Sequence, residues 1–532
     1  MGSHRDYIKV PNNCCSSMAV LETDNLEIYD IVSALDPNTS CGYDEISSKV
    51  IKSVIGHILP PLVAIFNNSL QTGVFPDQLK IAKVRPIHKS DDKLALNNYR
   101  PISVLPVLSK ILEKLMYKRL LNYLHKCEIL TDKQYGFRQN HSTYMAIIDI
   151  VDKISNEIDN KNFTAGVFID LSKAFDTIDH DILLDKMYLY GIRGVALNWF
   201  KSYLHNRKQY VQIDGVKSEL SVIKCGVPQG SILGPLLFIL YINDIINVSD
   251  IANIVMFADD TNIFFSGKNL ITLTATINSE LDKISNWFKL NRLSLNIKKT
   301  HYILFCCRNR KLAFDAINIK IDGVMIEKVT STKFLGVIIN ESLTWNEHIQ
   351  TIKQKVSKSI GIIKRLQYKM PRSVLKILYT SMVAPYLEYC NIVWGIDRSV
   401  VFNSLFLLQK KIIRIITNSK WNSHSKPLFH QQTVLPLACI NDFQIACFMY
   451  RSVHNLLPIK FTEMFRHNLS VHSYGTRQKD DLHKIHWRLH IRKNTVRVFG
   501  PGLWNSLPRN MRDAKTISIF KIAYKTMLIG AI

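Results

Sequence analysis

Apolar residues follow two different periods along the chain, and the period predicts where helices and strands lie. Spacings of three and four residues, which place apolar side chains on one face of a helix, recur over 26–35, 46–55, 60–72, 108–125, 143–159, 181–190, 197–204, 273–291, 348–370, 372–389, 402–417 and 438–455. Continuous or alternating apolar runs bounded by turn residues, which are typical of strands, occupy 81–89, 98–104, 164–170, 209–213, 254–265, 301–305 and 333–339. We therefore expect an α+β protein whose last third is helical.

Two adjacent aspartates, Asp259 and Asp260, divide the strand-like run 254–265, as in a β-hairpin with carboxylates at its tip. At about 4 Å and an effective dielectric near 20, two carboxylates repel each other by roughly 4 kcal/mol. A cation removes this repulsion, and Mg²⁺ is commonly bound by one or two protein carboxylates together with substrate phosphates. An isolated Asp-Asp pair is more often an ordinary polar turn, so a metal site depends on what accompanies the pair.

A third aspartate stands where another strand ends. The continuous apolar run 164–169 predicts a strand that is buried on both faces, and Asp170 follows its last residue. Ligands commonly bind at such strand ends, so we expect Asp170 to meet the aspartate pair around one bound-ion site. Asp176 and Asp179 are alternatives, but as residues of a turn and a helix start they are explained more simply as caps.

Two further features suit a ligand that carries phosphate. Lys89 and Arg100 are expected on two short strands joined by a polar turn, where two cations could hold a triphosphate; alone, such residues are more often a solvated face. The loop 225–231 carries Gln229 and Gly230 ahead of an apolar helix, and its glycines let the backbone approach a sugar-phosphate or base closely. A simple helix start would explain the Gly and Pro residues of this loop, but not Gln229.

The 532-residue chain carries a formal net charge of +25, and most of this charge lies in one region. Residues 346–532 hold 29 Lys and Arg against 8 Asp and Glu, interspersed with aromatic and aliphatic residues. A folded region this basic is expected to bind a polyanion such as nucleic acid. A solubilising excess of charge is the simpler alternative, and a membrane-surface role is less favoured because the apolar positions are needed for a core.

Cysteine spacing and the lengths of apolar runs also indicate the cellular compartment of the protein. Its ten cysteines, with no zinc-type spacing, argue against a disulfide scaffold and against a zinc site. No uninterrupted apolar run reaches the ~18 residues of a membrane span, and the N-terminus has no apolar signal core. We therefore expect an intracellular protein, in the nucleus, the cytoplasm or both, that is neither secreted nor bound to a membrane.

Seven short motifs occur in series along the chain. They are 98–104, 134–138, 168–176, 226–235, 257–260, 296–300 and 334–336. Together they resemble the reverse transcriptase of non-LTR (LINE-type) retrotransposons, closest to the Jockey-like group. Each motif is weak alone, but seven in the order of that family, across residues 26–345, are highly specific. The segment 502–508 also resembles these elements.

The resemblance implies an α+β right-hand polymerase with fingers, a palm built on an antiparallel sheet and a helical thumb, followed by a basic helical C-terminal region. With the polar N-terminus, which gives no structural signal, it leads us to expect four segments along the chain. These are a disordered N-terminus at 1–25, an N-terminal extension and fingers at 26–163, the palm with further fingers segments at 164–345, and the basic thumb and C-terminal region at 346–532.

The same resemblance implies roles for the candidate residues. The palm carboxylates that bind two Mg²⁺ ions, for which Mn²⁺ is an alternative, are matched by Asp170, Asp259 and Asp260. A lysine near the leaving pyrophosphate, acting as a general acid, is matched by Lys299. The residues around the incoming nucleotide are matched by Lys89, Arg100, Gln229, Gly230 and Phe175, the last of which would exclude a 2′-OH. The primer grip is matched by Phe334, Leu335 and Gly336.

The implied reaction extends a DNA primer at its target on an RNA template, using deoxynucleoside triphosphates. Autonomous elements of this kind carry an endonuclease ahead of the polymerase, and the sequence has no room for it, so we expect an endonuclease missing from this chain. The alternative is a catalytically silent nucleic-acid-binding remnant; the intact carboxylates favour the enzyme, and the missing endonuclease favours the remnant. A maturase- or telomerase-like protein would need accessory RNA-binding domains that we do not find in the sequence.

Overall fold

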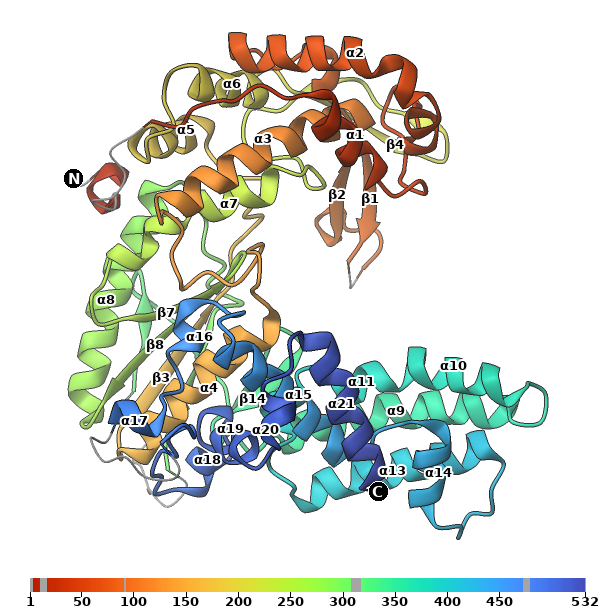
Figure 1. The fold of residues 1–532 in the computed structure, drawn as a ribbon. Coiled ribbons are helices and arrows are strands. Elements are labelled where there is room, and N and C mark those ends of the chain that lie inside the picture. The colour runs from red at the N-terminus through yellow and green to blue at the C-terminus, as the bar shows by residue number, and fades with distance from the viewer. Residues whose placement is uncertain (1–2, 10–16, 90–91, 308–316, 472–478, 532) are drawn as a thin grey trace.

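The computed structural model describes residues 3–9, 17–89, 92–307, 317–471 and 479–531, and it has a mixed α/β fold. The ribbon curves into the shape of a C around an open space (Figure 1). One arm contains the N-terminal helices and a small sheet. The back of the curve contains α7 Gly234–Tyr241 and α8 Leu270–Leu290, and the other arm contains the central sheet and the C-terminal helices.

The central sheet has five strands in the order β12, β9, β3, β8 and β7. These strands are β3 Phe163–Ile169, β7 Asn253–Phe257, β8 Asp260–Gly267, β9 His301–Phe305 and β12 Glu327–Lys328. β3 is antiparallel to both β8 and β9, and all of its residues are buried. Ala165, Val167 and Ile169 share an apolar core with α8, whereas Phe168 shares a second core with α4 Thr143–Asp159. The continuous apolar run of β3 therefore reflects two buried faces, as predicted.

The N-terminal arm is built around a smaller sheet. β1 Ile81–His88 pairs antiparallel with β2 Tyr99–Val104 and parallel with β4 Lys208–Ile213, and β4 also pairs with the short strands β5 Val216–Lys217 and β6 Ser221–Val222. The helices of this arm are α1 Asn25–Ser33, α2 Ser48–Thr72, α3 Val107–Lys126, α5 His180–Leu189 and α6 Gly194–Leu204. The β1–β2 hairpin projects from this arm toward the other one (Figure 1).

One helix, α2, replaces the two helices that the sequence pattern predicted on either side of Pro60 and Pro61. A proline inside a helix removes a backbone hydrogen bond and leaves a carbonyl without its partner. Both prolines, and Gly56 and His57 in the turn before them, are exposed, so water can satisfy the freed carbonyls. The helix therefore continues where the sequence suggested a boundary.

By length and composition alone, α2 could cross a membrane, and so could the bent pair α14 Ser425–Gln432 and α15 Leu437–Val453. The search for an uninterrupted apolar run did not indicate α2, because lysines, a histidine and two prolines interrupt its apolar residues. One or two such helices are weak evidence for a membrane span, because core helices of soluble proteins have the same properties.

Parts of the N-terminal segment 1–25, which we expected to be disordered, make specific contacts. The short helix η1 His4–Tyr7 binds α5 through Arg5, whose Nε donates to Asp185 Oδ2 at 2.7 Å, and Met18 is buried. The described residues 3–9 and 17–25 are therefore folded onto the protein, through partners that no local sequence pattern reveals. Residues 1–2 and 10–16 lie outside the described residues.

Helices fill the C-terminal region, as its periodicity predicted. α9 Asn346–Leu366 packs against α13 Val400–Thr417, and α15 packs against α19 Val496–Asn505 and α21 Ile517–Gly530. The shorter helices are α10 Arg372–Met382, α11 Ala384–Glu388, α12 Asn391–Trp394, α16 Ile459–Thr462, α17 Asn468–Val471, α18 His490–Lys493 and α20 Arg509–Arg512. This region shares one apolar core with α4 and with one face of the central sheet.

The segment 333–339 is a hairpin turn with its flanking strands, not the single strand that we predicted. β13 Ser331–Phe334 pairs with β14 Val337–Asn340, and Leu335 and Gly336 between them have φ of +44° and +82°. Two positive φ values are typical of the tight turn that matches strand twist. Leucine rarely adopts this conformation, so its sequence does not signal the turn. A second small hairpin joins β10 Lys320–Ile321 and β11 Val324–Met325.

Candidate active site at the aspartate turn

Strand pairing brings Asp170, Asp259 and Asp260 to the same end of the central sheet. β7 and β8 form the predicted hairpin, with Asp259 in its turn and Asp260 as the first residue of β8. β3 pairs with β8 so that Ile169 is opposite Thr261. Asp170 therefore leaves β3 beside the point where β8 begins.

Neighbouring carboxylates and partial burial affect the ionisation of the two turn aspartates, Asp259 and Asp260. The side chains of Asp259 and Asp260 reach solvent, yet the surrounding protein removes part of their hydration. This desolvation, together with the negative charges of Asp259 and Asp170, raises the pKa of Asp260 to about 6. Desolvation and Asp170 likewise raise the pKa of Asp259. Lys89 opposes the rise at both residues and Arg100 opposes it at Asp259, so the cations of the β1–β2 hairpin act on the same space as the carboxylates.

Two residues that sequence reasoning did not single out orient Asp170. Asn296 donates from its side-chain amide to Asp170 Oδ2 at 3.0 Å and from its backbone N–H to Asp170 O at 2.9 Å. The backbone N–H of Asp170 donates to Thr300 Oγ1 at 3.3 Å. Both partners belong to the motif 296–300, but nothing local in that motif shows that it contacts a strand end 126 residues earlier.

The donor set suits a divalent cation that is shared with a substrate. Within the part of the chain that the structure describes, no three His, Cys, Asp or Glu side chains converge closely enough to enclose a metal ion alone. Mg²⁺ commonly keeps one or two protein carboxylates and completes its octahedron with phosphate oxygens and water. Carboxylates that raise one another's pKa are stabilised in their charged form when a cation binds between them. The aspartates therefore fit a divalent cation when a phosphate-bearing ligand supplies the remaining oxygens.

Lys299 is near the aspartates in the fold but does not contact them. Its backbone N–H donates to Asn296 O at 3.1 Å, and its side chain is exposed. The described contacts do not bring its ammonium group to any of the three carboxylates.

Lys89 and Arg100 lie at the end of the β1–β2 hairpin where the connecting loop joins the two strands. Arg100 is opposite Ile87 in the strand pair, and the backbone N–H of Lys89 donates to Asn98 O at 2.8 Å just beyond β1. Both side chains are exposed. The pairing therefore places the two cations near each other with no acidic partner of their own in the described hairpin.

The loop that follows Asp170 meets the loop that carries Gln229. Val227 N donates to Phe175 O at 2.9 Å, and Gln229 Nε2 donates to Asp176 Oδ1 at 2.9 Å. The Phe175 ring stacks on Phe238 of α7, with centroids 4.5 Å apart. Phe175 and Gln229 are thus brought together by contacts between their own loops.

The two aspartates that we considered as alternative metal ligands have other partners. Asp179 is the N-cap of α5, as expected, and accepts from Ile182 N at 3.0 Å. Asp176 is not a cap, contrary to our expectation, because its carboxylate accepts from Gln229. Burial raises the pKa of Asp176, and this hydrogen bond opposes the rise.

β2 and α3 hold the backbone of the loop with Gln229 and Gly230. Ser103 N donates to Gln229 O at 2.7 Å, and a Cβ on Gly230 would lie 2.6 Å from Ser103 O. The buried carboxylate of Glu113 accepts from Ile232 N at 2.7 Å. Sequence reasoning missed Glu113, although a charged residue at a core-facing position of an amphipathic helix was a usable signal.

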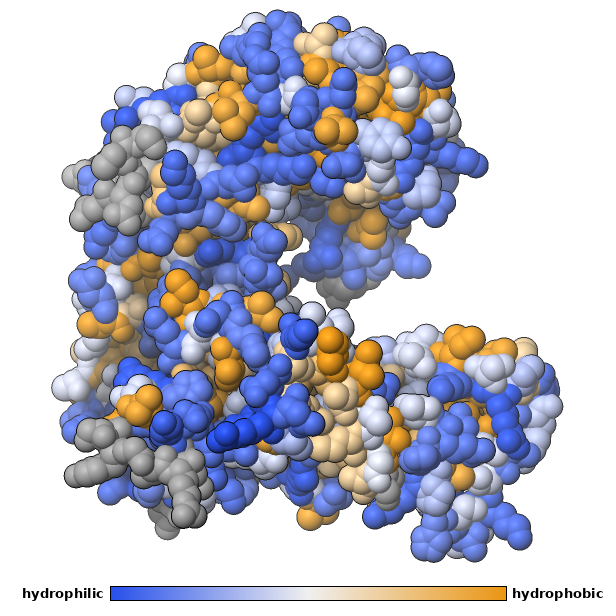
Figure 2. All heavy atoms as spheres, in the orientation of Figure 1, coloured by the Kyte–Doolittle hydropathy of each residue, from blue (hydrophilic) through white to orange (hydrophobic). Residues whose placement is uncertain are grey.

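The turn at Leu335 and Gly336 is tied to the same end of the central sheet. Phe334 packs against Phe168, two residues before Asp170, with ring centroids 6.4 Å apart. The hydroxyl of Tyr389 donates to Leu335 O at 2.7 Å. A space-filling view shows the molecule hollowed between its two arms, with hydrophilic residues along much of the rim (Figure 2). The β1–β2 hairpin borders this hollow on one side, and α10 and α11 border it on the other.

Comparison with known proteins points to one family. Residues 87–339 match the family described as reverse transcriptase (RNA-dependent DNA polymerase). The chain is 29% identical over 438 residues to the RNA-directed DNA polymerase from mobile element jockey of Drosophila melanogaster, which covers 80% of this chain and 47% of that protein. It is also 29% identical over 409 residues to the probable RNA-directed DNA polymerase from transposon BS of Drosophila melanogaster, covering 74% of this chain and 44% of that one. The jockey protein of Drosophila funebris is 29% identical over 413 residues, covering 76% and 44%. The chain spans less than half the length of these relatives.

Proposed function

We propose that this chain is an RNA-directed DNA polymerase of a non-LTR retrotransposon, because residues 87–339 match the family described as reverse transcriptase. It would extend a DNA primer on an RNA template with deoxynucleoside triphosphates. The observation that carries the proposal is the meeting of Asp170 with the turn aspartates at one end of the central sheet, facing the cations of the β1–β2 hairpin.

The proposed chemistry is nucleotidyl transfer by two cations, Mg²⁺ or Mn²⁺, held by Asp170, Asp259 and Asp260. When bound, the cations would supply charge stabilisation for the attacking and leaving oxygens. Asn296 keeps Asp170 oriented for this role through the hydrogen bond to Oδ2. Lys299 would give a proton to the leaving pyrophosphate, which requires its exposed side chain to turn toward the substrate.

The incoming nucleotide would lie between the two loops and the hairpin described above. Lys89 and Arg100 would bind its triphosphate by charge-assisted hydrogen bonds. Phe175 would lie against its sugar and exclude a 2′-OH, because stacking on Phe238 prevents the ring from moving aside. Gln229 and Gly230 would line the base and the template.

The proposed layout is that of a right-hand polymerase. Residues 26–163 would form the N-terminal extension and fingers, 164–345 the palm with fingers segments, and 346–532 the basic thumb and C-terminal region, with Phe334, Leu335 and Gly336 as the primer grip. The exposed lysines of α9 would bind the phosphates of the primer–template duplex. Such substrates imply work inside the cell, in the nucleus or the cytoplasm.

Primer extension on poly(rA)/oligo(dT) with Mg²⁺ tests the proposal. We expect synthesis by the wild type that Asp259→Asn abolishes, because the substitution removes a carboxylate charge from the proposed cation site. The matched control is Asp24→Asn, the same change of carboxylate to amide at the N-cap of α1, where asparagine caps about as well as aspartate. No synthesis by a folded wild type that still binds the duplex would instead support a silent nucleic-acid-binding remnant.

A further inference from the structure

A buried glutamine holds the backbone that precedes the turn aspartates. The N–H of Ala258 donates to Gln134 Oε1 at 2.9 Å, and Gln134 Nε2 donates to Ala258 O at 3.4 Å. Gly136 lies so close that a Cβ there would be 2.3 Å from Ala258 N. Ala258 has a φ of +55°, which is strained for alanine. The turn therefore depends on these contacts to keep its conformation.

The neighbours of Gln134 also pair with β7. Tyr135 N donates to Met256 O at 2.8 Å, and Met256 N donates to Lys133 O at 2.9 Å, which makes a short parallel bridge. Met256 is two residues before Ala258. The segment 133–136 therefore holds β7 at Met256 and the backbone at Ala258, immediately before the aspartates.

Tyr135 is anchored by α4 and by the C-terminal region. Its hydroxyl donates to Asp149 Oδ2 at 3.1 Å, and Lys460 of α16 donates to the same Oδ2 at 2.6 Å and to the Tyr135 hydroxyl at 3.1 Å. The Asp149 side chain is only 4% exposed. Burial disfavours its charged form, but Lys153 and Lys460 outweigh this and keep the pKa of Asp149 below its ordinary value. Removing Lys460 would leave a buried carboxylate short of positive charge.

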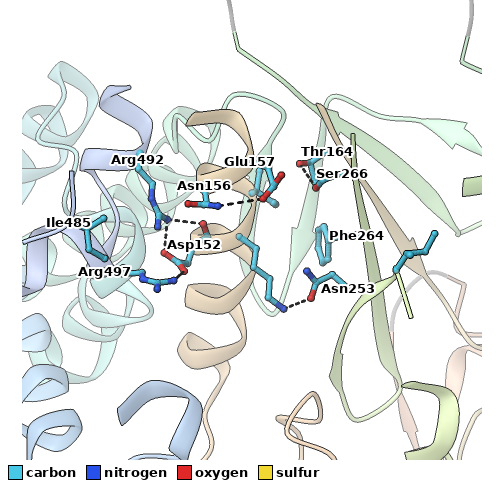
Figure 3. Close-up of a pocket in the computed structure, with 13 residues that line it drawn as sticks. Asp152, Asn156, Glu157, Thr164, Asn253, Phe264, Ser266, Ile485, Arg492 and Arg497 are labelled. Atoms are coloured by element: carbon cyan, nitrogen blue, oxygen red, sulfur yellow. Dashed lines mark hydrogen bonds and ion pairs between the residues drawn. The ribbon is translucent and has the colours of Figure 1, made fainter. Parts of the chain in front are cut away.

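The rest of α4 is held from both sides, as Figure 3 shows around a cavity of about 470 Å³. On one side, Asp152 accepts from Arg492 Nη1 at 2.6 Å and from Arg497 Nη1 at 2.9 Å. On the other side, Lys153 donates to Asn253 Oδ1, in β7, at 2.5 Å. The helix α4 thus lies between the C-terminal segment and the strand that leads to the aspartate turn.

We propose that Lys460, Arg492 and Arg497 of the C-terminal region position the aspartate turn for catalysis. They would act through α4 and the segment 133–136, with Lys460 and Gln134 as positioning residues. This inference rests on the proposed polymerase function. It gives the C-terminal region a role in the geometry of the site, separate from any binding of a duplex on its basic surface. A displacement of about 1 Å in catalytic groups can cost about 100-fold in rate, so small shifts of α4 would be measurable.

The test compares the full chain with Lys460→Met, Lys460→Arg and Gln134→Ala. For Lys460→Met and Gln134→Ala we expect a single-nucleotide incorporation rate that is about 10- to 100-fold lower, with unchanged dissociation constants for primer–template. Lys460→Arg keeps the positive charge and should retain most of the rate. The matched control is Lys289→Met. It breaks the ion pair between Lys289 and Asp322, which has the same 2.6 Å length as the pair between Lys460 and Asp149 but does not involve α4.

A second readout does not depend on activity. Hydrogen exchange at residues 254–260 should be faster in Lys460→Met than in the wild type and unchanged in Lys289→Met, although Lys460 does not touch this turn. If Lys460→Met does not fold, Arg497→Gln, at a partly exposed position, should give the same pattern. Unchanged exchange in this turn, or a loss of duplex affinity with an unchanged incorporation rate, overturns the inference. An inactive wild type with altered exchange in Lys460→Met overturns the polymerase proposal alone.

Discussion

Replacing Gly230 by alanine tests whether the loop beside Gln229 has to keep its backbone shape. Gly230 has a φ of +118°, which L-residues rarely adopt, so alanine is strained there whatever the free space. Its Cβ would also lie 2.6 Å from Ser103 O. That oxygen belongs to the backbone of β2, which is paired with β1 and cannot move aside easily.

The expected loss of activity in Gly230→Ala follows from the backbone strain at this position. A residue forced into a sparsely populated conformation costs about 1–3 kcal/mol. Because about 1.4 kcal/mol corresponds to a tenfold change, this predicts a kcat/KM for nucleotide incorporation that is about 5- to 150-fold lower. The assay is single-nucleotide incorporation over a range of deoxynucleotide concentrations, with thermal denaturation of the same samples to show that the variant folds.

The control for this prediction is Gly215→Ala, in the turn between β4 and β5. Gly215 also has a positive φ, +87°, but a Cβ there would meet nothing within 4 Å. Gly215→Ala should therefore lower the free energy of unfolding slightly and leave kcat/KM for nucleotide incorporation close to the wild-type value. If Gly230→Ala incorporates nucleotides as efficiently as Gly215→Ala, the loop does not need the conformation seen here, and the reasoning is refuted.

Three further tests concern the turn aspartates, the loop with Gln229 and a buried ion pair between Lys186 of α5 and Asp244, which follows α7. Because desolvation and its aspartate neighbours raise the pKa of Asp260 to about 6, the Mg²⁺ needed for half-maximal primer extension should rise about tenfold per pH unit below that pH; a flat profile contradicts this. Glu113→Ala leaves buried amides of the loop 226–234 without an acceptor, so nucleotide kcat/KM should fall by about 5- to 100-fold, and an unchanged value argues against this role. Lys186 contacts the buried Asp244 carboxylate at 2.5 Å, so Lys186→Met leaves this carboxylate without its cation. The free energy of unfolding, measured by chemical denaturation, should fall by about 3–5 kcal/mol. Adding Asp244→Leu should recover much of that loss.

Strand β3 and the aspartate hairpin could be predicted because their signals are local. A continuous apolar run identified β3, and two apolar runs divided by carboxylates identified the hairpin. The pairing of Ile169 with Thr261 could not be predicted, because it joins segments about ninety residues apart and depends on how both faces of the sheet pack. The helix boundary expected at Pro60 and Pro61 was wrong for a related reason, since exposure on the folded surface decides whether a proline ends a helix.

The residues that position the site escaped prediction because their partners are distant in the sequence. Gln134 contacts Ala258, 124 residues later, and nothing near Gln134 shows this. The carboxylates of α4 look like a solvated face of an amphipathic helix, yet Asp149 binds Lys460, 311 residues later, and Asp152 binds Arg492, 340 residues later. Such charges could be recognised only once the C-terminal region was seen to cover α4.

The geometry of the aspartate site is therefore fixed by two cores at once. Alternate residues of β3 enter different cores, Val167 with α8 and Phe168 with α4, so a slip of one residue between β3 and β8 would misplace both and turn Asp170 to the wrong face. The core on the α4 side is shared with the C-terminal helices. Deleting residues 346–532 would remove that packing together with the basic surface, so lost activity would not separate scaffold from duplex binding. Substitutions can separate them: exposed lysines of α9 should change the salt dependence of binding, whereas Lys460 should change the rate of incorporation.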